Sequence, residues 1–172
     1  MESPLVTLIT TALLLYWPAY LGNMMPPIAG ALRLPGGSPI SVRVLGKNKT
    51  WRGVISGVIG GMLGAASLWY LGWSWFAAQT FPVTVGTGAL MGAGALGGDL
   101  IKSAVKRALS IPSGRPFIPW DQWDFVLGAT LCTLFILPLT VPLILTALVV
   151  TFVLHFAVNI AAYWLGLKDV WW

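Results

Sequence analysis

The chain has 172 residues, of which 57% are hydrophobic and only 9% are charged, and its formal net charge is +5 at pH 7. A soluble domain carries about 25% charged residues, so this composition excludes a soluble globular protein and predicts one all-α integral membrane domain over residues 1–172. Nucleic-acid binding is a poor explanation for the basic excess, because little soluble surface remains outside the apolar segments. The single cysteine, Cys132, excludes an internal disulfide.

Five apolar segments predict about five transmembrane helices. In chain order they cover about residues 5–21, 53–73, 81–98, 119–137 and 143–165. The third helix is expected to continue beyond the bilayer to Arg107. A re-entrant pair is the alternative for the last two segments, because each spanning helix needs about 20 residues.

The predicted loop 23–52 carries five basic residues and no acidic residue. Lys and Arg are enriched in cytoplasmic loops, so this loop is expected to face the cytoplasm. Five spans, with the N-terminus outside and the C-terminus cytoplasmic, place all ten Lys and Arg on the cytoplasmic side. The sequence thus predicts a multi-pass protein of the cell membrane, with Arg33, Arg43 and Lys47 as positive-inside anchors.

Small residues mark the second and third apolar segments. Gly53, Gly57, Gly61 and Ala65 recur every four residues, which aligns small side chains along one helix face and lets another helix approach closely. The segment 92–97 matches GxGxxG, but no strand precedes it, so close helix packing is the better interpretation than dinucleotide binding. We therefore expect these two helices to pack against each other.

Three of the five acidic residues lie between Asp99 and Asp124. On a helix, Asp99, Ser103 and Lys106 fall within about 60° of one another, with Lys102 and Arg107 flanking that arc. Asp121 and Asp124 share a face at the start of the fourth helix. Carboxylates without His or Cys suit a hard cation such as Mg²⁺, and the neighbouring Lys and Arg suit phosphate oxygens.

A second basic motif runs from Lys49 through Thr50 and Arg52 to Gly53, immediately before the glycine-striped helix. If that helix packs on the third one, which ends at Asp99, the motif lies beside the carboxylates. A metal next to basic side chains at the bilayer surface predicts a nucleotide and phosphate site at the cytoplasmic interface. The alternative is a solvated patch of salt bridges.

The spacing Gly98-Asp99-Leu100-x-x-Ser103-x-x-Lys106-Arg107, then Asp121-x-x-Asp124, resembles the signature of CTP-dependent cytidylyltransferases that make CDP-activated lipids. The segment 49–53 resembles the Lys-Thr-x-Glu-Gly element of that family. Bacterial members usually read Asp-Arg-x-Asp where this chain has Gln122, and Pro112-Ser113 replace their Lys-Asp pair. Asp121-Gln122-x-Asp124-Phe125, Asn23 and the segment 166–170 resemble instead the archaeal branch, the CDP-archaeol synthases.

The resemblance implies transfer of CMP from CTP to 2,3-bis-O-(geranylgeranyl)glycerol 1-phosphate, giving CDP-unsaturated archaeol and pyrophosphate. A phosphomonoester has a second pKa of about 6, so the acceptor is largely dianionic at pH 7 and needs no general base. Asp99, Asp121 and Asp124 are expected to bind Mg²⁺ and, with Lys106, to form the catalytic set. The expected nucleotide and phosphate ligands are Asn23, Lys49, Thr50, Arg52, Ser103 and Arg107.

Several alternatives stay open at this level. His155 and Asn159, four residues apart in an apolar helix, are either functional groups or partners in interhelical hydrogen bonds, and the second explanation is favoured. Arg115 is expected to meet a phosphate or a lipid head group. The alternative functions are a phosphatidate cytidylyltransferase, a CTP-dependent polyprenol or phytol kinase, and a small membrane transporter. The oligomeric state is left open.

Overall fold

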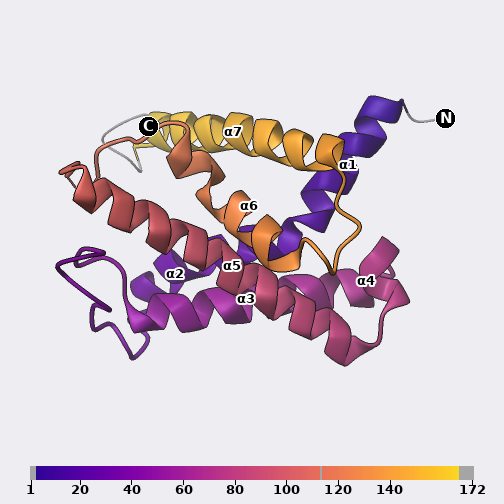
Figure 1. Ribbon diagram of the computed structural model, residues 1–172, viewed down its shortest axis with the longest axis horizontal. Coiled ribbons are helices and arrows are strands. Elements are labelled where there is room, and N and C mark those ends of the chain that lie inside the picture. The colour runs from indigo at the N-terminus through magenta and orange to yellow at the C-terminus, as the bar shows by residue number, and fades with distance from the viewer. Residues whose placement is uncertain (1–2, 113, 167–172) are drawn as a thin grey trace.

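The computed structural model describes residues 3–112 and 114–166, which form a bundle of helices (Figure 1). The elements are α1 (Pro4–Leu15), α2 (Trp17–Ala31), α3 (Trp51–Tyr70), α4 (Ser74–Ala78), α5 (Phe81–Ala108), α6 (Trp120–Thr133) and α7 (Val141–Trp164). Helix α3 packs mainly on α2 and α5, α5 also packs on α6, and α7 contacts α1 and α6. The all-α class predicted from the sequence is confirmed.

The first apolar segment forms two helices, α1 and α2, which are bent by 48° at their junction. Pro18 lies in the first turn of α2 and has no N–H to donate to the preceding turn, so the chain bends here. Helix α2 then runs through Pro26 and Pro27 to Ala31. The predicted end of this helix near residue 21, with a loop from residue 23, is therefore wrong.

Close packing explains why α2 continues through its two prolines. A Cβ on Gly22 would lie 3.0 Å from Gly92 Cα and 3.1 Å from the Gly57 carbonyl oxygen, so α2 runs almost in backbone contact with α3 and α5. This burial compensates for the hydrogen bonds that proline cannot donate. Asn23 consequently lies inside α2, not at the end of the first helix as the sequence suggested.

The remaining predicted helices are present with shifted ends. Helix α5 continues to Ala108, which confirms that the third apolar segment extends into the charged cluster. Helix α3 stops at Tyr70, because the chain turns at Gly72 with φ +71° and then forms the short α4. Helix α6 ends at Thr133, four residues before its predicted end at 137.

Two helices of the described residues, α3 and α7, are long and apolar enough to cross a membrane. The bent pair of α1 and α2 adds a third span if it crosses as one unit. Helix α6 has 14 residues, fewer than the about 20 that a straight span needs. The structure thus supports a helical membrane protein, and the number of five spans stays a prediction.

Glycines set the distance between α3, α5 and α6. A Cβ on Gly61 would lie 2.2 Å from the carbonyl oxygen of Gly88, which confirms the predicted contact between the two glycine-rich helices. A Cβ on Gly98 would lie 2.0 Å from the carbonyl oxygen of Asp124. Because Gly98 precedes Asp99, the same contact brings the carboxylates of α5 and α6 together.

The basic loop between α2 and α3 is tied to the start of α3. Pro39 and Thr50 form an isolated antiparallel bridge, and the Ile40 N–H donates to the Lys49 carbonyl at 2.8 Å. Arg52 Nη1 donates to the Leu34 carbonyl at 2.9 Å. Figure 1 shows this loop at the same end of the bundle as the C-terminal end of α7, with α4 and the start of α1 at the opposite end.

Replacing Gly98 by Ala is expected to destabilise the protein by about 1–3 kcal/mol, because the new methyl group overlaps backbone atoms of α6. Gly97→Ala is the matched control, since a Cβ there meets nothing within 4 Å. Thermal unfolding in detergent measures both variants. Equal melting temperatures for the two variants would contradict the proposed backbone contact.

Candidate functional site

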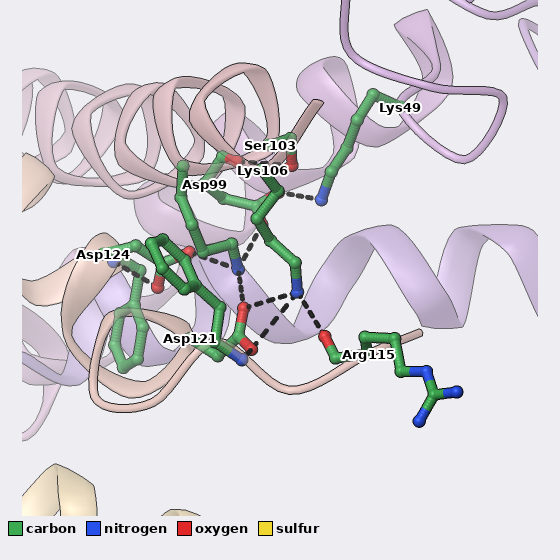
Figure 2. Close-up of polar contacts among 10 residues, drawn as sticks. Lys49, Asp99, Ser103, Lys106, Arg115, Asp121 and Asp124 are labelled. Atoms are coloured by element: carbon green, nitrogen blue, oxygen red, sulfur yellow. Dashed lines mark hydrogen bonds and ion pairs between the residues drawn. The ribbon is translucent and has the colours of Figure 1, made fainter. Parts of the chain in front are cut away.

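Three carboxylates from α5 and α6 converge on the ammonium of Lys102. Figure 2 shows these carboxylates, which belong to Asp99, Asp121 and Asp124. Lys102 Nζ lies 2.7 Å from Asp124 Oδ2, 3.1 Å from Asp99 Oδ1 and 3.2 Å from Asp121 Oδ1. The Lys102 side chain is only 15% exposed and that of Asp124 only 5%. The structure thus brings together the three aspartates that the sequence predicted as metal ligands.

Two further lysines complete this carboxylate cluster. Lys49, from the basic loop, pairs with Asp99, and Lys106 Nζ lies 3.3 Å from the carboxylate oxygens of Asp121. Lys106 also donates to the Arg115 carbonyl at 2.5 Å, so it ties the segment before α6 to α5. Three ammonium groups therefore balance three carboxylates, which limits the electrostatic cost of burying them.

The position of Lys102 keeps it charged. Burial by itself lowers the pKa of Lys102, but the carboxylates of Asp124, Asp99 and Asp121 outweigh burial and raise the pKa above its ordinary value. This side chain extends from the part of α5 that follows its apolar portion, residues 81–98. A permanent positive charge therefore lies where the three carboxylates meet.

The donor set of the carboxylate cluster fits a hard cation such as Mg²⁺. Three carboxylate oxygens from separate side chains lie between 2.7 and 3.2 Å from one point, the Lys102 Nζ. Oxygen ligands from carboxylates are those that Mg²⁺ prefers. Among the described residues, no group of three His, Cys, Asp or Glu side chains is arranged to hold a metal. In the carboxylate cluster, the Lys102 ammonium lies at the point where the three carboxylates converge.

A cavity of about 490 Å³, here called the Asn23 cavity, opens beside this cluster. Its walls come from α2, the basic loop, α3 and α5, and they include four of the predicted nucleotide ligands together with one predicted metal ligand: Asn23, Lys49, Thr50, Arg52 and Asp99. The expected association of the segment 49–53 with Asp99 is therefore present. Lys47, interpreted as an anchor, also lines this cavity.

Thr50 and Arg52 both have structural partners at the Asn23 cavity. The Thr50 hydroxyl oxygen accepts from the Gly53 N–H at 3.2 Å and so caps the N-terminus of α3. A hydroxyl group that accepts one hydrogen bond can also donate its own proton to an anion. The Arg52 guanidinium holds the basic loop through Leu34 and packs on Gly37. The first turn of α3 lines the cavity, and backbone N–H groups at the N-terminus of a helix favour anions.

Ser103 and Arg107 line a smaller cavity of about 140 Å³, the Arg107 cavity. Ser103 Oγ donates to the Asp99 carbonyl at 2.7 Å, so this hydroxyl is engaged with its own helix. Lys49 and Asn48 line both the Arg107 cavity and the Asn23 cavity. The two cavities are therefore neighbours across the Lys49 side chain.

A third cavity, the Asn159 cavity of about 290 Å³, lies between α5, α6 and α7. It contains the three residues whose roles the sequence left open: Arg115, His155 and Asn159. Lys102, Lys106 and Asp121 of the carboxylate cluster line it as well. The two polar residues of α7 thus face the candidate site.

Sequence reasoning placed Lys102 only on the flank of the charged arc and assigned Gln122 no role. The relevant signal for Lys102 was its position three residues after Asp99 on a helix, since a lysine can extend toward the preceding turn. Gln122 lines the Asn159 cavity, and Asn48 lines both cavities on the other side of the cluster. No spacing in the sequence singled out Asn48.

One segment that carries the family resemblance lies at the C-terminal end of the chain. The segment 166–170 resembled the archaeal branch, and of it only Gly166 is among the described residues. The rest of this match lies outside the described residues.

The chain is similar to known proteins along most of its length. The family model described as CarS-like, CDP-archaeol synthase, matches residues 5–172. The CDP-archaeol synthase of Methanospirillum hungatei is 39% identical over 173 residues, covering 90% of this chain and 99% of the relative. That of Pyrococcus abyssi is 38% identical over 168 residues, covering 90% and 93%.

A solved structure, described as an intramembrane enzyme for archaeal membrane lipids biosynthesis, has the same fold. It superposes with a TM-score of 0.75 at 28% identity, over 88% of this chain and 94% of the other. The helical arrangement is thus shared along almost the whole length of both proteins. With a family model that matches nearly the entire sequence, the chain belongs to the CDP-archaeol synthase family.

Proposed function

We propose that this protein transfers CMP from CTP to 2,3-bis-O-(geranylgeranyl)glycerol 1-phosphate, giving CDP-unsaturated archaeol and pyrophosphate in archaeal phospholipid biosynthesis. The observation that carries this proposal is the carboxylate cluster around Lys102, open to a cationic cavity, in a member of the CDP-archaeol synthase family. A transporter needs charge along a path through the membrane, whereas these carboxylates gather at one end of the bundle.

The Asn23 cavity supplies the groups that a nucleoside triphosphate needs. Lys49, Arg52 and the first turn of α3 offer positive charge and N–H donors to phosphate oxygens. Pro27 cannot donate to the carbonyl of Asn23, so that carbonyl and the Asn23 amide remain acceptors at the cavity. An acceptor at this position suits the exocyclic amino group of cytosine.

Mg²⁺ is the cofactor we expect, held by Asp99, Asp121 and Asp124. When bound, such an ion neutralises the negative charge of the triphosphate and of the leaving pyrophosphate. Lys106 and Arg107 add positive charge on the same side of α5 and orient phosphate groups. The acceptor phosphate is already ionised, so the protein has to position it but does not have to remove a proton from it.

The acceptor substrate distinguishes the proposed function from the alternative functions. A polyprenol or phytol kinase must activate a neutral alcohol and needs a base, whereas the lysine-paired aspartates here suit charge neutralisation. A phosphatidate cytidylyltransferase uses the same chemistry on an ester lipid. The CDP-archaeol synthase relatives favour the ether lipid as the acceptor.

For the membrane topology we propose five spans: the bent pair α1–α2, then α3, α5, α6 and α7. The N-terminus then lies outside, and the active site lies at the cytoplasmic interface. The distribution of Lys and Arg supports this orientation, as does the grouping of the basic loop with the C-terminal end of α7 at one end of the bundle (Figure 1).

The direct test is pyrophosphate release by purified protein in detergent. The nucleotide is CTP, ATP or GTP with Mg²⁺, and the acceptor is the digeranylgeranylglycerol phosphate or phosphatidic acid. We expect release only with CTP and the ether lipid, and none when EDTA replaces Mg²⁺. Release with phosphatidic acid alone would show that the protein is a phosphatidate cytidylyltransferase. CTP-dependent phosphorylation of an alcohol would show that it is a kinase.

Asp99→Asn and Asp121→Asn should each lower kcat by at least about a hundredfold, because each removes a carboxylate that we assign to Mg²⁺. Steady-state pyrophosphate release measures kcat, and thermal unfolding shows that the variants remain folded. Arg43→Gln, in the basic loop and outside the site, is the control and should keep its activity. Full activity in either Asp variant would remove the metal assignment.

Lys102→Gln should tighten Mg²⁺ binding in the absence of nucleotide, because the Lys102 ammonium and the metal compete for the same three carboxylates. We expect at least about a tenfold change in Kd, since one unit charge removed from a partly buried site is worth more than about 1.4 kcal/mol. Titration calorimetry with Mg²⁺, or electron paramagnetic resonance with Mn²⁺, measures it. The metal-free variant should also melt lower than the wild type, and Mg²⁺ should restore its stability.

Lys47→Gln is the matched control, because it removes the same charge from the rim of the Asn23 cavity. Its metal affinity should change less than that of Lys102→Gln. Lys102→Arg retains the charge and is not expected to tighten metal binding. Unchanged or weaker metal affinity in Lys102→Gln, with a loss of stability that Mg²⁺ does not reverse, would show that Lys102 is a purely structural partner.

A further inference from the structure

The Asn159 cavity is predominantly cationic and polar. Its charged and polar side chains are Lys102, Lys106, Arg115, Asp121, Gln122, His155 and Asn159. Asp121, its only carboxylate among the described lining residues, already accepts from Lys106 and from the Phe117 N–H at 2.6 Å. Lys102 and Lys106 are shared with the carboxylate cluster, and Arg115 adds a further positive charge. The described lining thus holds three cationic side chains and one carboxylate, which suits an anion.

Gln122 adds an amide group to the lining of this cavity. The residue is 3% exposed, and its Oε1 has no hydrogen-bond partner among the described residues. An unpaired buried amide oxygen is costly, and a ligand or an ordered water relieves that cost. Rotated about its last bond, the same amide presents an N–H to a phosphate or ether oxygen.

The Asn159 cavity lies across the carboxylate cluster from the Asn23 cavity. The two cavities share no lining residue, and each contains one carboxylate of the cluster, Asp99 in the Asn23 cavity and Asp121 in the Asn159 cavity. Lys102 pairs with both carboxylates and so connects the two sides. Transfer between two substrates requires this arrangement, with the donor and the acceptor approaching the reacting phosphorus from different sides.

An apolar groove adjoins the Asn159 cavity at Lys102. This Trp120 groove has a volume of about 420 Å³ and lies between α5 and α6. Its apolar side chains are Ile101, Val105, Phe117, Trp120, Leu127 and Leu131. Lys102 lines both spaces, so one molecule with an anionic head and an apolar chain can occupy the cavity and the groove together.

We propose that the Asn159 cavity binds the phosphomonoester head of the acceptor lipid and that an isoprenoid chain enters the Trp120 groove. This assignment rests on the proposed cytidylyl transfer and deepens it. Lys106 and Arg115 provide charge for the phosphate, and Asn159, His155 and Gln122 orient the phosphate and the glycerol ether oxygens. Arg115 and the polar pair of α7 thereby gain roles that the sequence left open.

In the proposed transfer, one bond forms and one bond breaks at the α-phosphorus of CTP. An oxygen of the acceptor phosphate forms a bond to the α-phosphorus of CTP. The bond from that phosphorus to the oxygen bridging the α- and β-phosphates breaks, and pyrophosphate leaves with the electron pair. The Asn159 cavity acts as a positioning site, because its residues hold the attacking phosphate and take no proton from it.

Asn159→Ala and Gln122→Met test the assignment by their separate effects on the two substrates. Each should raise the KM for the ether lipid about tenfold to a hundredfold, the effect of losing one hydrogen bond to a charged group. The KM for CTP should not change. Asn23→Ala should show the opposite pattern, and Val158→Ala, next to Asn159 but exposed, should leave both KM values unchanged.

Two small anions distinguish a lipid head group from free phosphate. Glycerol 1-phosphate, which lacks the chains, should inhibit competitively against the lipid, and its inhibition should weaken in Asn159→Ala. Inorganic phosphate should inhibit much less than glycerol 1-phosphate. Equal inhibition by both anions would assign the cavity to free phosphate and overturn the lipid assignment.

Different results would refute the acceptor site and the proposed cytidylyl transfer. Wild-type protein that releases no pyrophosphate with any lipid would refute the cytidylyl transfer. Active wild-type protein whose Asn159→Ala variant has an altered KM for CTP alone would refute the acceptor site. If Asn159→Ala does not fold, Gln122→Met and Arg115→Gln provide the same readout, and unchanged lipid KM values in both would overturn the assignment.

Discussion

The backbone contact between α5 and α6 is the constraint on which the site depends. At Gly98 and Gly128 the two helices approach so closely that a Cβ would lie 2.0 Å from a backbone oxygen of the neighbouring helix. Asp99 directly follows Gly98, and Asp124 supplies the oxygen that Gly98 meets. The small residues therefore serve more than helix packing, because their spacing sets how near the carboxylates of the two helices lie.

The electrostatics of the site follow from that proximity. Three carboxylates at one interface would repel one another, and the ammonium groups of Lys102, Lys49 and Lys106 offset this repulsion. Lys102 lies at the centre and remains protonated. The described arrangement is therefore charge-balanced, and its carboxylate oxygens converge on one point, as the proposed Mg²⁺ site requires.

In the proposed reaction, the two cavities beside this centre bind different substrates. The Asn23 cavity offers a helix N-terminus and basic side chains, whereas the Asn159 cavity offers a cationic pocket that adjoins an apolar groove. A water-soluble nucleotide and a membrane lipid need opposite surroundings. Placing them on two sides of one charged centre lets both reach it from their own phase, which is a physical reason for a site at the membrane interface.

The sequence by itself determined the helical membrane class, the glycine-mediated contact of the second and third segments, and the grouping of three aspartates with basic side chains. These follow from composition and helical periodicity, which are local properties. Only the tertiary structure decided that α2 continues through Pro26 and Pro27, that Lys102 lies between the carboxylates, and that Gln122, His155 and Asn159 face one cavity. Each of these features depends on contacts between helices that are distant in the chain. Periodicity within one segment does not specify such contacts.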